Sequence, residues 1–236
     1  MPAAPAAETL LVTGANRGIG LELTRQALQR GLRVVATCRS PYAADALHAL
    51  ERAQPGAIQV AALDVTDAGS VSALAAALAG RTLDIVVNNA GVYGGAAQDL
   101  AETDFRAWAH TLDVNTLGPL RVTLALLPHL RRSKRPRVVT LSSEMGAFAA
   151  DGGAAYAYRS SKAAVNKVMQ VLARDLRAAG VVAVPVHPGW VRTDMGGREA
   201  PVSPEESARG LLDLIGRLTL RDSGHFHAWT GERLPW

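Results

Sequence analysis

Short runs of β-branched and apolar residues alternate along the chain with longer segments of helical period. The expected strands are Thr9–Thr13, Arg33–Thr37, Ile58–Leu63, Asp84–Asn88, Arg137–Ser142 and Val181–His187, with Phe226–Trp229 as a candidate for a last strand. The expected helices are Gly18–Arg30, Tyr42–Arg52, Ser70–Leu78, Asp113–Arg132 and Ala155–Ala179. Because parallel strands need a crossover between them, usually a helix, the alternation predicts an α/β fold with a doubly wound parallel sheet of about seven strands and helices on both faces.

The length and composition are those of one globular domain. The chain has 236 residues, of which 48% are hydrophobic and 19% charged, and a chain of this size buries a full core of its own. We see no repeat and no dividing linker, so residues 1–236 are expected to form a single domain. Residues 1–7 are rich in Ala and Pro and are expected to be a loose tail.

The first residues carry no basic side chain and are followed by no long apolar run, so we expect neither a signal peptide nor a transmembrane segment. The single cysteine, Cys38, excludes an internal disulfide and agrees with a reducing compartment. A cytoplasmic protein with no membrane partner is expected.

The net charge of +4 raises the question of nucleic acid. The densest basic run is Arg131, Arg132, Lys134, Arg135 and Arg137, at the end of an expected helix and in the loop after it. Cations there complement the helix dipole and stay solvated, and no aromatic residues are interleaved with them. We therefore expect no nucleic-acid partner.

One helix start is well marked. Ser203-Pro204-Glu205-Glu206 offers an N-cap, a proline in the first turn and a Glu that can close a capping box, and the helix is expected to run to about Arg217. Residues 188–202 then form a glycine-bearing loop after a central strand, which is either an active-site lid or an irregular crossover.

A glycine-rich turn follows the first strand and opens a helix, with the order Thr13-Gly14-Ala15-Asn16-Arg17-Gly18-Ile19-Gly20. Glycines allow a tight turn and bring backbone N–H groups close to a pyrophosphate at the helix N-terminus. The spacing G-x-x-x-G-x-G is one residue longer than the usual dinucleotide fingerprint. The turn predicts a dinucleotide site that uses Gly14, Asn16, Arg17, Gly18, Ile19 and Gly20.

The end of the second strand indicates which dinucleotide binds. An NAD enzyme usually has Asp or Glu about 20 residues beyond the glycines, where this chain has Arg39. A guanidinium forms charge-assisted hydrogen bonds with a 2′-phosphate, and Arg17 would add a second cation on the same side. NADPH is therefore the predicted cofactor, with NAD as the alternative, and Asp64 is a candidate partner for the adenine amino group.

The segment Tyr158-Arg159-Ser160-Ser161-Lys162 begins a long helical pattern. Residues four apart share one helix face, so the phenol of Tyr158 and the ammonium of Lys162 are expected to face one site. A free phenol has a pKa of about 10, and a nearby cation is expected to lower the pKa of Tyr158 toward the range that suits proton transfer. A preceding strand ends in Ser142-Ser143, where a hydroxyl can hydrogen-bond a substrate oxygen.

Taken in order, these motifs resemble the short-chain dehydrogenase/reductase family over nearly the whole chain. The matching pieces are residues 13–20, Leu63-Asp64-Val65, Asn88-Asn89-Ala90-Gly91, Asn115, Ser142-Ser143, Tyr158 with Lys162, and Pro188-Gly189. Further segments look like the C-factor-like carbonyl reductase branch of that family, namely Tyr156-Ala157-Tyr158-Arg159, Pro188 to Met195, and Leu234-Pro235-Trp236. The resemblance implies a Rossmann-type fold.

The resemblance also implies roles for the catalytic positions. Tyr158 would exchange a proton with the substrate oxygen, while Lys162 would lower the pKa of Tyr158 and hold the nicotinamide ribose. Ser143 is preferred over Ser142 for polarising the substrate oxygen, because the family's catalytic serine is usually the second of such a pair. Asn115 would anchor a water that leads protons from Lys162 to solvent. Cofactor contacts are implied for the glycine turn, Arg39, Asp64, Tyr158 and Lys162. The resemblance implies further cofactor contacts at Val65, Asn88, Ala90, Gly91, Pro188, Gly189, Val191 and Thr193.

Weaker signals receive structural interpretations. His187, at the end of its strand, is expected to be a buried, hydrogen-bonded histidine. His225 and His227 alternate on the candidate last strand and would share a face, but two ligands make a poor metal site, so no metal is predicted. Glu144 faces solvent or selects a polar substrate, and Trp190 packs against a substrate or covers the loop.

The function expected from all of this is an NADPH-dependent oxidoreductase that reduces an aldehyde or ketone to an alcohol, or runs the reverse oxidation. A small-molecule carbonyl or alcohol is the expected substrate. The resemblance implies a homodimer or homotetramer formed through the helices that carry Asn115 and Tyr158. The alternative from another class is a regulatory protein that binds the dinucleotide without catalysis.

Overall fold

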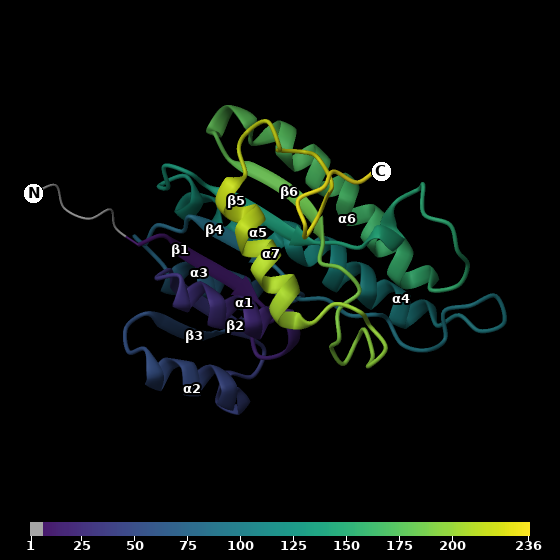
Figure 1. The fold of residues 1–236 in the computed structure, drawn as a ribbon, viewed down its shortest axis with the longest axis horizontal. Coiled ribbons are helices and arrows are strands. Elements are labelled where there is room, and N and C mark those ends of the chain that lie inside the picture. The colour runs from purple at the N-terminus through teal and green to yellow at the C-terminus, as the bar shows by residue number, and fades with distance from the viewer. Residues whose placement is uncertain (1–6) are drawn as a thin grey trace, which may run out of the picture.

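The computed structural model describes residues 7–236, and within them the strands form one seven-stranded parallel sheet with the order β3-β2-β1-β4-β5-β6-β7 (Figure 1). The strands are β1 Thr9–Thr13, β2 Arg33–Cys38, β3 Ile58–Ala62, β4 Ile85–Asn88, β5 Arg137–Leu141, β6 Val182–His187 and β7 His227–Ala228. Every pairing between neighbours is parallel. The predicted doubly wound sheet is confirmed, and its last strand is shorter than expected.

Helices cover both faces of the sheet. The helices are α1 Gly18–Gln29, α2 Asp45–Ala53, α3 Ala68–Ala77, α4 Phe105–Leu112, α5 Gly118–Leu130, α6 Tyr156–Asp175 and α7 Pro204–Arg217. Helix α7 packs on α1 on one face, and α3, α5 and α6 pack against the other (Figure 1).

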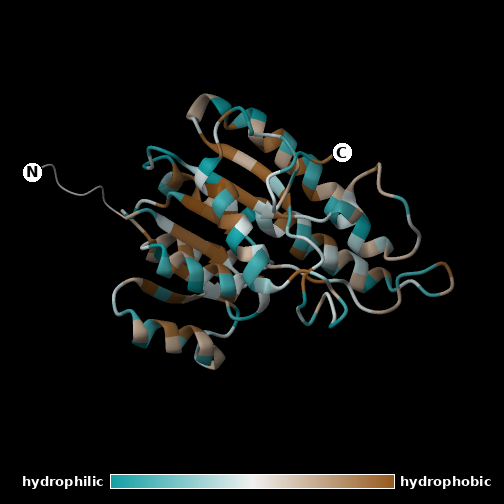
Figure 2. Ribbon diagram, viewed as in Figure 1, coloured by the Kyte–Doolittle hydropathy of each residue, from teal (hydrophilic) through white to brown (hydrophobic). Residues whose placement is uncertain are grey.

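Alternation along each central strand produces two cores. In β1, Leu10 and Val12 point into the core beneath α1 and α7, whereas Leu11 points into the core beneath α5 and α6. All three are fully buried, as expected for a strand covered on both faces. Figure 2 shows the result, with apolar strands in brown enclosed by helices whose outer surfaces carry the hydrophilic residues.

The helix expected at Asp113–Arg132 begins earlier. Asp104 caps α4 by accepting hydrogen bonds from the N–H groups of Arg106 and Ala107, and α4 then continues through a π-helical turn, Asp113–Leu117, into α5. Helix α4 was not among the expected helices. Asp104 lies in a polar stretch, and its role as an N-cap becomes evident only from the helical turn that follows it. The capping box at Ser203 forms as predicted.

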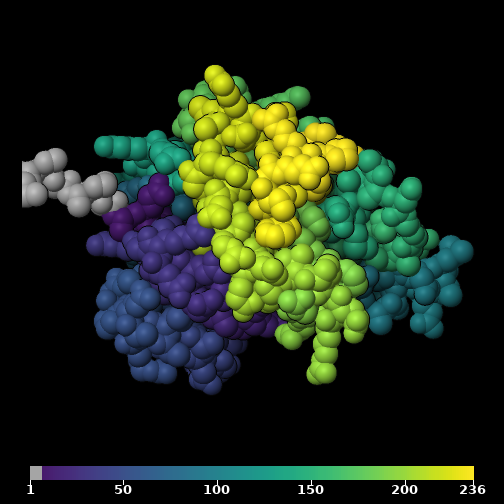
Figure 3. All heavy atoms as spheres, in the orientation of Figure 1, coloured from purple at the N-terminus to yellow at the C-terminus, as the bar shows by residue number. Residues whose placement is uncertain are grey.

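Two further segments differ in detail. The helix expected from Tyr42 starts at Asp45, after a short 3₁₀ turn over Pro41–Ala43. The loose tail expected for residues 1–7 lies, except for residue 7, outside the described residues. The C-terminal residues, yellow in Figure 3, lie against the surface beside α7. The last residue is hydrogen-bonded to the loop before α6, because the N–H of Ala149 donates to the carbonyl of Trp236.

No helix in residues 7–236 combines the length and the apolar character needed to cross a lipid bilayer.

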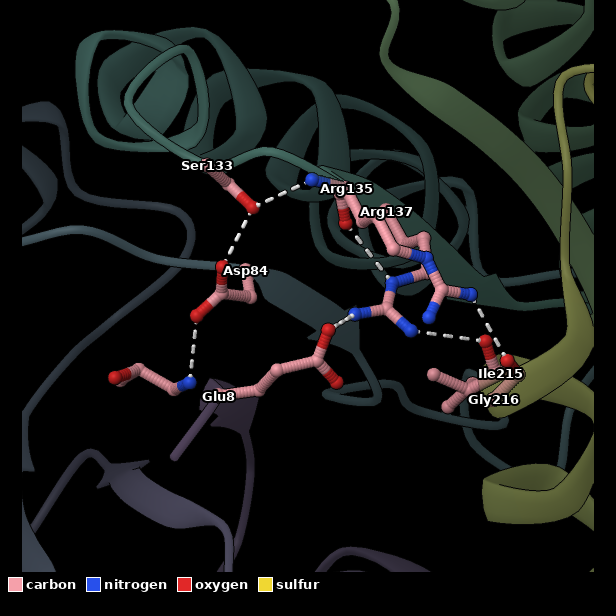
Figure 4. Close-up of polar contacts among 8 residues, drawn as sticks. Glu8, Asp84, Ser133, Arg135, Arg137, Ile215 and Gly216 are labelled. Carbon is pink, nitrogen blue, oxygen red and sulfur yellow. Dashed lines mark hydrogen bonds and ion pairs between the residues drawn. The ribbon is translucent and has the colours of Figure 1, made fainter. Parts of the chain in front are cut away.

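A polar network closes the amino-terminal edge of the sheet (Figure 4). The side chain of Arg137 is 2% exposed, and its guanidinium donates to the carbonyls of Arg135 and Ile215 and to the carboxylate of Glu8. These contacts join β5 to the residue before β1 and to the end of α7. The expectation that the whole basic run is solvated is therefore wrong for Arg137, because its strand carries it into the interior.

Asp84 forms the second half of this network. Its carboxylate accepts from the N–H of Thr9 at 2.8 Å and from the hydroxyl of Ser133 at 2.5 Å. Arg135 reaches the carbonyl of Gly216 at 3.0 Å. The loop before β5 is thus bonded to the start of β1 and to the last turn of α7.

Replacing Glu8 by Gln should leave the buried guanidinium of Arg137 without its counter-charge. We expect the free energy of unfolding to fall by about 1.5–3 kcal/mol, the range for hydrogen bonds to charged groups. Urea unfolding measures the change. Glu51→Gln, which removes a more exposed contact with His48, is the matched control, and an equal effect of both changes would contradict the role of the buried pair.

Candidate active site

The carboxyl ends of the central strands border a cleft of about 660 Å³. Most of the residues predicted to bind a cofactor line it together: Gly14, Asn16, Arg17, Gly18, Ile19, Arg39, Asp64, Val65, Ala90, Gly91, Tyr158, Lys162, Pro188 and Thr193. Gly20, Asn88, Gly189 and Val191 are not among the lining residues. The sequence motifs therefore converge on one place in the fold, although not every residue of each motif reaches the cleft.

The glycine turn is held in shape by the neighbouring strand. A Cβ at Gly20 would lie 2.4 Å from the carbonyl oxygen of Gly14 and 2.5 Å from Nδ2 of Asn89, so only glycine fits there. Asn89 donates from Nδ2 to the carbonyls of Thr13 at 2.8 Å and Gly14 at 3.0 Å. Gly20 thus serves packing, and Asn89 is a supporting residue to which the sequence analysis gave no role.

Thr13 completes this junction. Its hydroxyl accepts from the N–H groups of Asn89 at 3.0 Å and Ala90 at 2.9 Å. Asn88, in contrast, is buried and points away from the cleft, with Nδ2 donating to Thr123 and Thr140. The side chain of Asn88 therefore does not reach the cleft in which the cofactor is predicted to bind.

The N-terminus of α1 opens onto the cleft and has no side-chain cap. Its first N–H groups are free to receive an anion such as a pyrophosphate, and Gly14 and Gly18, both with positive φ, add no Cβ there. These features fit a dinucleotide.

Arg17 contacts the opposite wall. Its guanidinium lies 2.5 Å from the carboxylate of Asp194, in the loop after β6, and both side chains are mostly exposed. Asp194 was missed because nothing local links it to the glycine turn, 177 residues earlier.

Arg39 and Asp64 also line the cleft. The carboxylate of Asp64 accepts from the hydroxyl of Thr66 at 2.7 Å and from its N–H at 2.9 Å. These bonds, with a smaller contribution from the positive charge of Arg39, lower the pKa of Asp64. Asp64 is therefore ionised at neutral pH and can only accept hydrogen bonds through its side chain.

Helix α6 brings Tyr158 and Lys162 to one side of the cleft, as predicted. Lys162 is 6% exposed, and its Nζ donates to the carbonyl of Leu141 at 2.8 Å. Burial lowers the pKa of Lys162 to about 8. The ammonium lies 5.6 Å from the centre of the Tyr158 ring.

Burial also raises the pKa of Tyr158, and the hydrogen bond with Ser143 opposes this rise only in part. The pKa of Tyr158 thus departs upward, opposite to the lowering expected from Lys162, because desolvation of the phenol is the largest effect. The phenol keeps its proton at neutral pH, which is the form needed by a proton donor.

The two serines after β5 have separate surroundings. Ser142 is buried and donates to Oδ1 of Asn166 at 2.6 Å, whereas Ser143 is within hydrogen-bond reach of Tyr158. The structure thus brings together Ser143, Tyr158 and Lys162.

Asn115 lies in the π-helical turn between α4 and α5 and is almost fully buried. Its amide accepts from the N–H of Val92 and donates to the carbonyl of Val92 and to the hydroxyl of Ser161. A Cβ placed on Gly91 would lie 3.3 Å from Oδ1 of Asn115 and 3.8 Å from Nζ of Lys162, so Asn115 and Lys162 are neighbours across Gly91. A π-helical turn is frequent at functional sites.

His187 lies near Glu144, with 3.7 Å between Nε2 and the carboxylate. The ring is largely buried, and burial lowers its pKa. Its Nδ1 has no hydrogen-bond partner among the described residues, so the expectation of a buried, hydrogen-bonded histidine is met only in its burial. Glu144 is mostly exposed.

The other weak signals are resolved in the same way. His227 is buried in β7 and His225 is exposed before it, so the two do not share a face. Within residues 7–236 no group of three or more metal-ligating side chains comes together. The indole of Trp190 donates to the carbonyl of Gly196 within the loop after β6.

The lowered pKa of Lys162 has a consequence for stability. Between about 8 and the ordinary value of 10.5, the unfolded chain holds a proton on Lys162 that the folded chain has released. The free energy of unfolding should therefore rise as the pH is raised from about 8 towards 10. The raised pKa of Tyr158 acts in the opposite direction only above its ordinary value of 10.

Denaturant unfolding at a series of pH values measures this rise, and Lys162→Met should remove it. Lys167→Met, at an exposed position of the same helix, is the control and should leave it intact. The same pH dependence in Lys162→Met and the unchanged protein would refute the assignment.

Comparison with known proteins identifies relatives over almost the whole chain. A sequence model described as short chain dehydrogenase matches residues 8–202. C-signal of Myxococcus xanthus is 47% identical over 156 residues, which cover 65% of this chain and 93% of that protein. The 1-hydroxy-2-glutathionyl-2-methyl-3-butene dehydrogenase of Rhodococcus sp. (strain AD45) is 37% identical over 235 residues, or 97% and 99% of the two chains.

The solved structures agree with these relatives. The crystal structure of NADPH-bound carbonyl reductase from chicken fatty liver superimposes with a TM-score of 0.90 and 33% identity, covering 98% of this chain and 99% of that one. The family match spans well over half of the residues, and the fold and the full-length relatives agree with it. The chain belongs to the short chain dehydrogenase family.

Proposed function

We propose that this protein is an NADPH-dependent carbonyl reductase that converts an aldehyde or ketone to an alcohol. The observation that carries the proposal is the half-buried phenol of Tyr158 beside Ser143, on the wall of a cleft that fits a dinucleotide, with a raised pKa that keeps the phenol protonated. The carbonyl reductase from chicken fatty liver, similar along its whole length, supports the same chemistry.

NADPH is preferred over NADH because of charge. Arg17 and Arg39 both line the cleft, and guanidinium groups bind a 2′-phosphate through charge-assisted hydrogen bonds. No acidic residue stands at position 39 to repel that phosphate. Asp64 is proposed to accept a hydrogen bond from the adenine amino group.

The bound cofactor supplies the hydride. In the proposed mechanism the hydroxyl of Ser143 donates a hydrogen bond to the carbonyl oxygen and polarises it. Tyr158 then gives its phenolic proton to that oxygen as negative charge develops there. Lys162, which lines the same cleft, would hold the nicotinamide ribose hydroxyls. We propose that Asn115 anchors a water between Lys162 and solvent, so that Tyr158 is reprotonated.

The raised pKa of Tyr158 favours reduction over oxidation at neutral pH. A phenol that retains its proton is ready to act as the acid, whereas the reverse reaction needs the phenolate. Raising the pH is therefore expected to favour alcohol oxidation.

Replacing Tyr158 by Phe tests the catalytic role. The change removes the proton donor and keeps the ring, so kcat for NADPH oxidation with a panel of aldehydes, ketones and diketones should fall by roughly 10²- to 10⁴-fold. NADPH binding, measured by fluorescence titration, should change little. Tyr156→Phe, two residues away, is the control and should keep its activity.

Wild-type turnover in Tyr158→Phe would contradict the mechanism. NADPH binding without turnover of any carbonyl by the wild-type protein would instead favour a regulatory protein that binds the dinucleotide.

Replacing Arg39 by Asp tests the cofactor. Loss of one charge-assisted hydrogen bond corresponds to about 1.5–3 kcal/mol, so the preference for NADPH over NADH in kcat/KM should fall on the order of 10- to 100-fold. Arg52→Asp, on α2 outside the cleft lining, is the control for charge alone. An unchanged preference for NADPH over NADH in Arg39→Asp would contradict the proposed role of Arg39.

Assembly, loop function and location are proposed as well. The exposed apolar side chains of Leu117, Leu124 and Val171 lie at or along α5 and α6 and support a homodimer or homotetramer formed through these helices. The pair Arg17–Asp194 supports a lid role for residues 188–202. The single cysteine supports a cytoplasmic location.

A further inference from the structure

Helix α6, which carries Tyr158 and Lys162, begins without an ordinary N-cap. Its N-cap residue is Ala155, whose side chain has no hydrogen-bond acceptor. Ala154 and Ala155 both have positive φ, 55° and 53°, a conformation that costs free energy in residues other than glycine and that recurs at functional sites. The first N–H groups of the helix therefore need acceptors from elsewhere in the chain.

Gln98 supplies two of these acceptors from the loop after β4. Its backbone carbonyl accepts from the N–H of Tyr156 at 3.3 Å, and its side-chain Oε1 accepts from the N–H of Tyr158 at 3.0 Å. The side chain is buried, with Gln98 only 4% exposed. One residue thus performs the capping role that Ala155 leaves unfilled, and it does so at the backbone of Tyr158 itself.

The other end of the same amide holds Tyr93. Nε2 of Gln98 donates to the carbonyls of Tyr93 at 2.9 Å and Gly95 at 2.8 Å. The ring of Tyr93 packs on the ring of Tyr158, with 5.0 Å between their centres, and its proximity contributes to the raised pKa of Tyr158. Gln98 is therefore bonded to the backbone of both tyrosines in this ring pair.

The chemistry of these contacts requires an amide. Two carbonyl oxygens face one end of the side chain and an N–H faces the other, so the residue must donate twice and accept once. A carboxylate would meet the two carbonyls with negative charge, and an apolar side chain would leave all three groups without a partner.

The backbone of Gln98 is itself anchored. Gln98 forms an antiparallel bridge with Thr103, and the N–H of Asp104 donates to the carbonyl of Ala97 at 3.3 Å. Asp104 is the N-cap of α4. The amide therefore extends from a small hairpin that is fixed to α4.

We propose that Gln98 is a positioning residue for the proton transfer: it sets the place of the Tyr158 phenol relative to Ser143 by holding the first turn of α6 and the ring of Tyr93 together. This role rests on the proposed function of Tyr158 as proton donor. Gln98 acts through the two tyrosines and is absent from the lining of the cleft.

The test is Gln98→Met, which keeps the volume of the side chain and removes its hydrogen bonds. Displacing a reacting group by about 1 Å costs on the order of 100-fold in rate, so kcat should fall between roughly 10- and 100-fold while the Kd for NADPH stays within about twofold. The pH profile of kcat should shift as well, since the surroundings that raise the pKa of Tyr158 have changed. Backbone amide exchange in residues 156–158 should become faster.

Two control variants separate positioning from general stability. Gln170→Met makes the same substitution on α6, the helix that carries Tyr158, at a site where the side-chain oxygen accepts a hydrogen bond from Lys167, and should leave every readout unchanged. Glu8→Gln destabilises the far edge of the sheet and should leave the pH profile of kcat unchanged. Gln98→Glu should not rescue activity, because it restores the acceptor and loses the two donors.

An unchanged kcat and pH profile in Gln98→Met would overturn the proposal, even if amide exchange became faster, since Gln98 would then be a helix cap alone. Failure of the proposed function has a different signature, namely no carbonyl turnover by the wild-type protein. In that case ultraviolet titration of the Tyr158 phenol, taken as the difference from Tyr158→Phe, decides the matter: a pKa shifted by Gln98→Met supports positioning, and an identical pKa overturns it.

Discussion

The position of β1 in the sheet order determines where this protein can bind a ligand. Strand β1 lies between β2 and β4, so the chain leaves it toward one side of the sheet and later returns on the other. At such a switch point the helices on the two faces diverge, and a crevice opens beyond the carboxyl ends of the strands. The glycine turn after β1 and Asn89 after β4 meet there and hydrogen-bond directly. The cofactor cleft is thus a consequence of strand order, and the side chains refine it.

Desolvation dominates the electrostatics of Tyr158 and Lys162, the two groups proposed to handle the proton. Burial raises the pKa of Tyr158 and lowers that of Lys162, so it favours the neutral form of both. The two shifts move the pKa values apart, from ordinary values of 10.0 for the phenol and 10.5 for the amine to a value above 10 for Tyr158 and about 8 for Lys162. The ammonium of Lys162 is then the stronger acid of the two, so a Tyr158 phenolate formed during turnover is readily reprotonated from the side of Lys162.

The sequence was sufficient for features that depend on local spacing. The strand and helix alternation, the glycine turn and the capping box at Ser203 are all written within a few residues, and the structure confirms them. The pairing of Tyr158 and Lys162 on one helix face follows from a spacing of four residues. These local patterns were enough to predict the family and the location of the cleft.

Long-range contacts were beyond such patterns. Arg137 belongs by sequence to a solvated basic run, and only the register of β5 shows that it is buried. The pKa of Tyr158 was predicted in the wrong direction because the depth of burial is a property of the assembled fold. Gln98 lies 60 residues from Tyr158 along the chain, so no local motif links the two.

Buried polar groups at the two edges of the sheet have different consequences for the protein. At the amino-terminal edge, Arg137 and Asp84 join β1, β5 and α7, where no predicted catalytic residue lies. At the carboxyl edge, Asn115, Lys162 and Gln98 are also buried and hydrogen-bonded, but their partners are the backbone around the cleft. An unpaired buried polar group costs free energy at either edge. At the carboxyl edge, by the role proposed for Gln98, the loss would also displace the Tyr158 phenol, so the buried polar residues proposed to support catalysis lie apart from the network around Arg137 and Asp84.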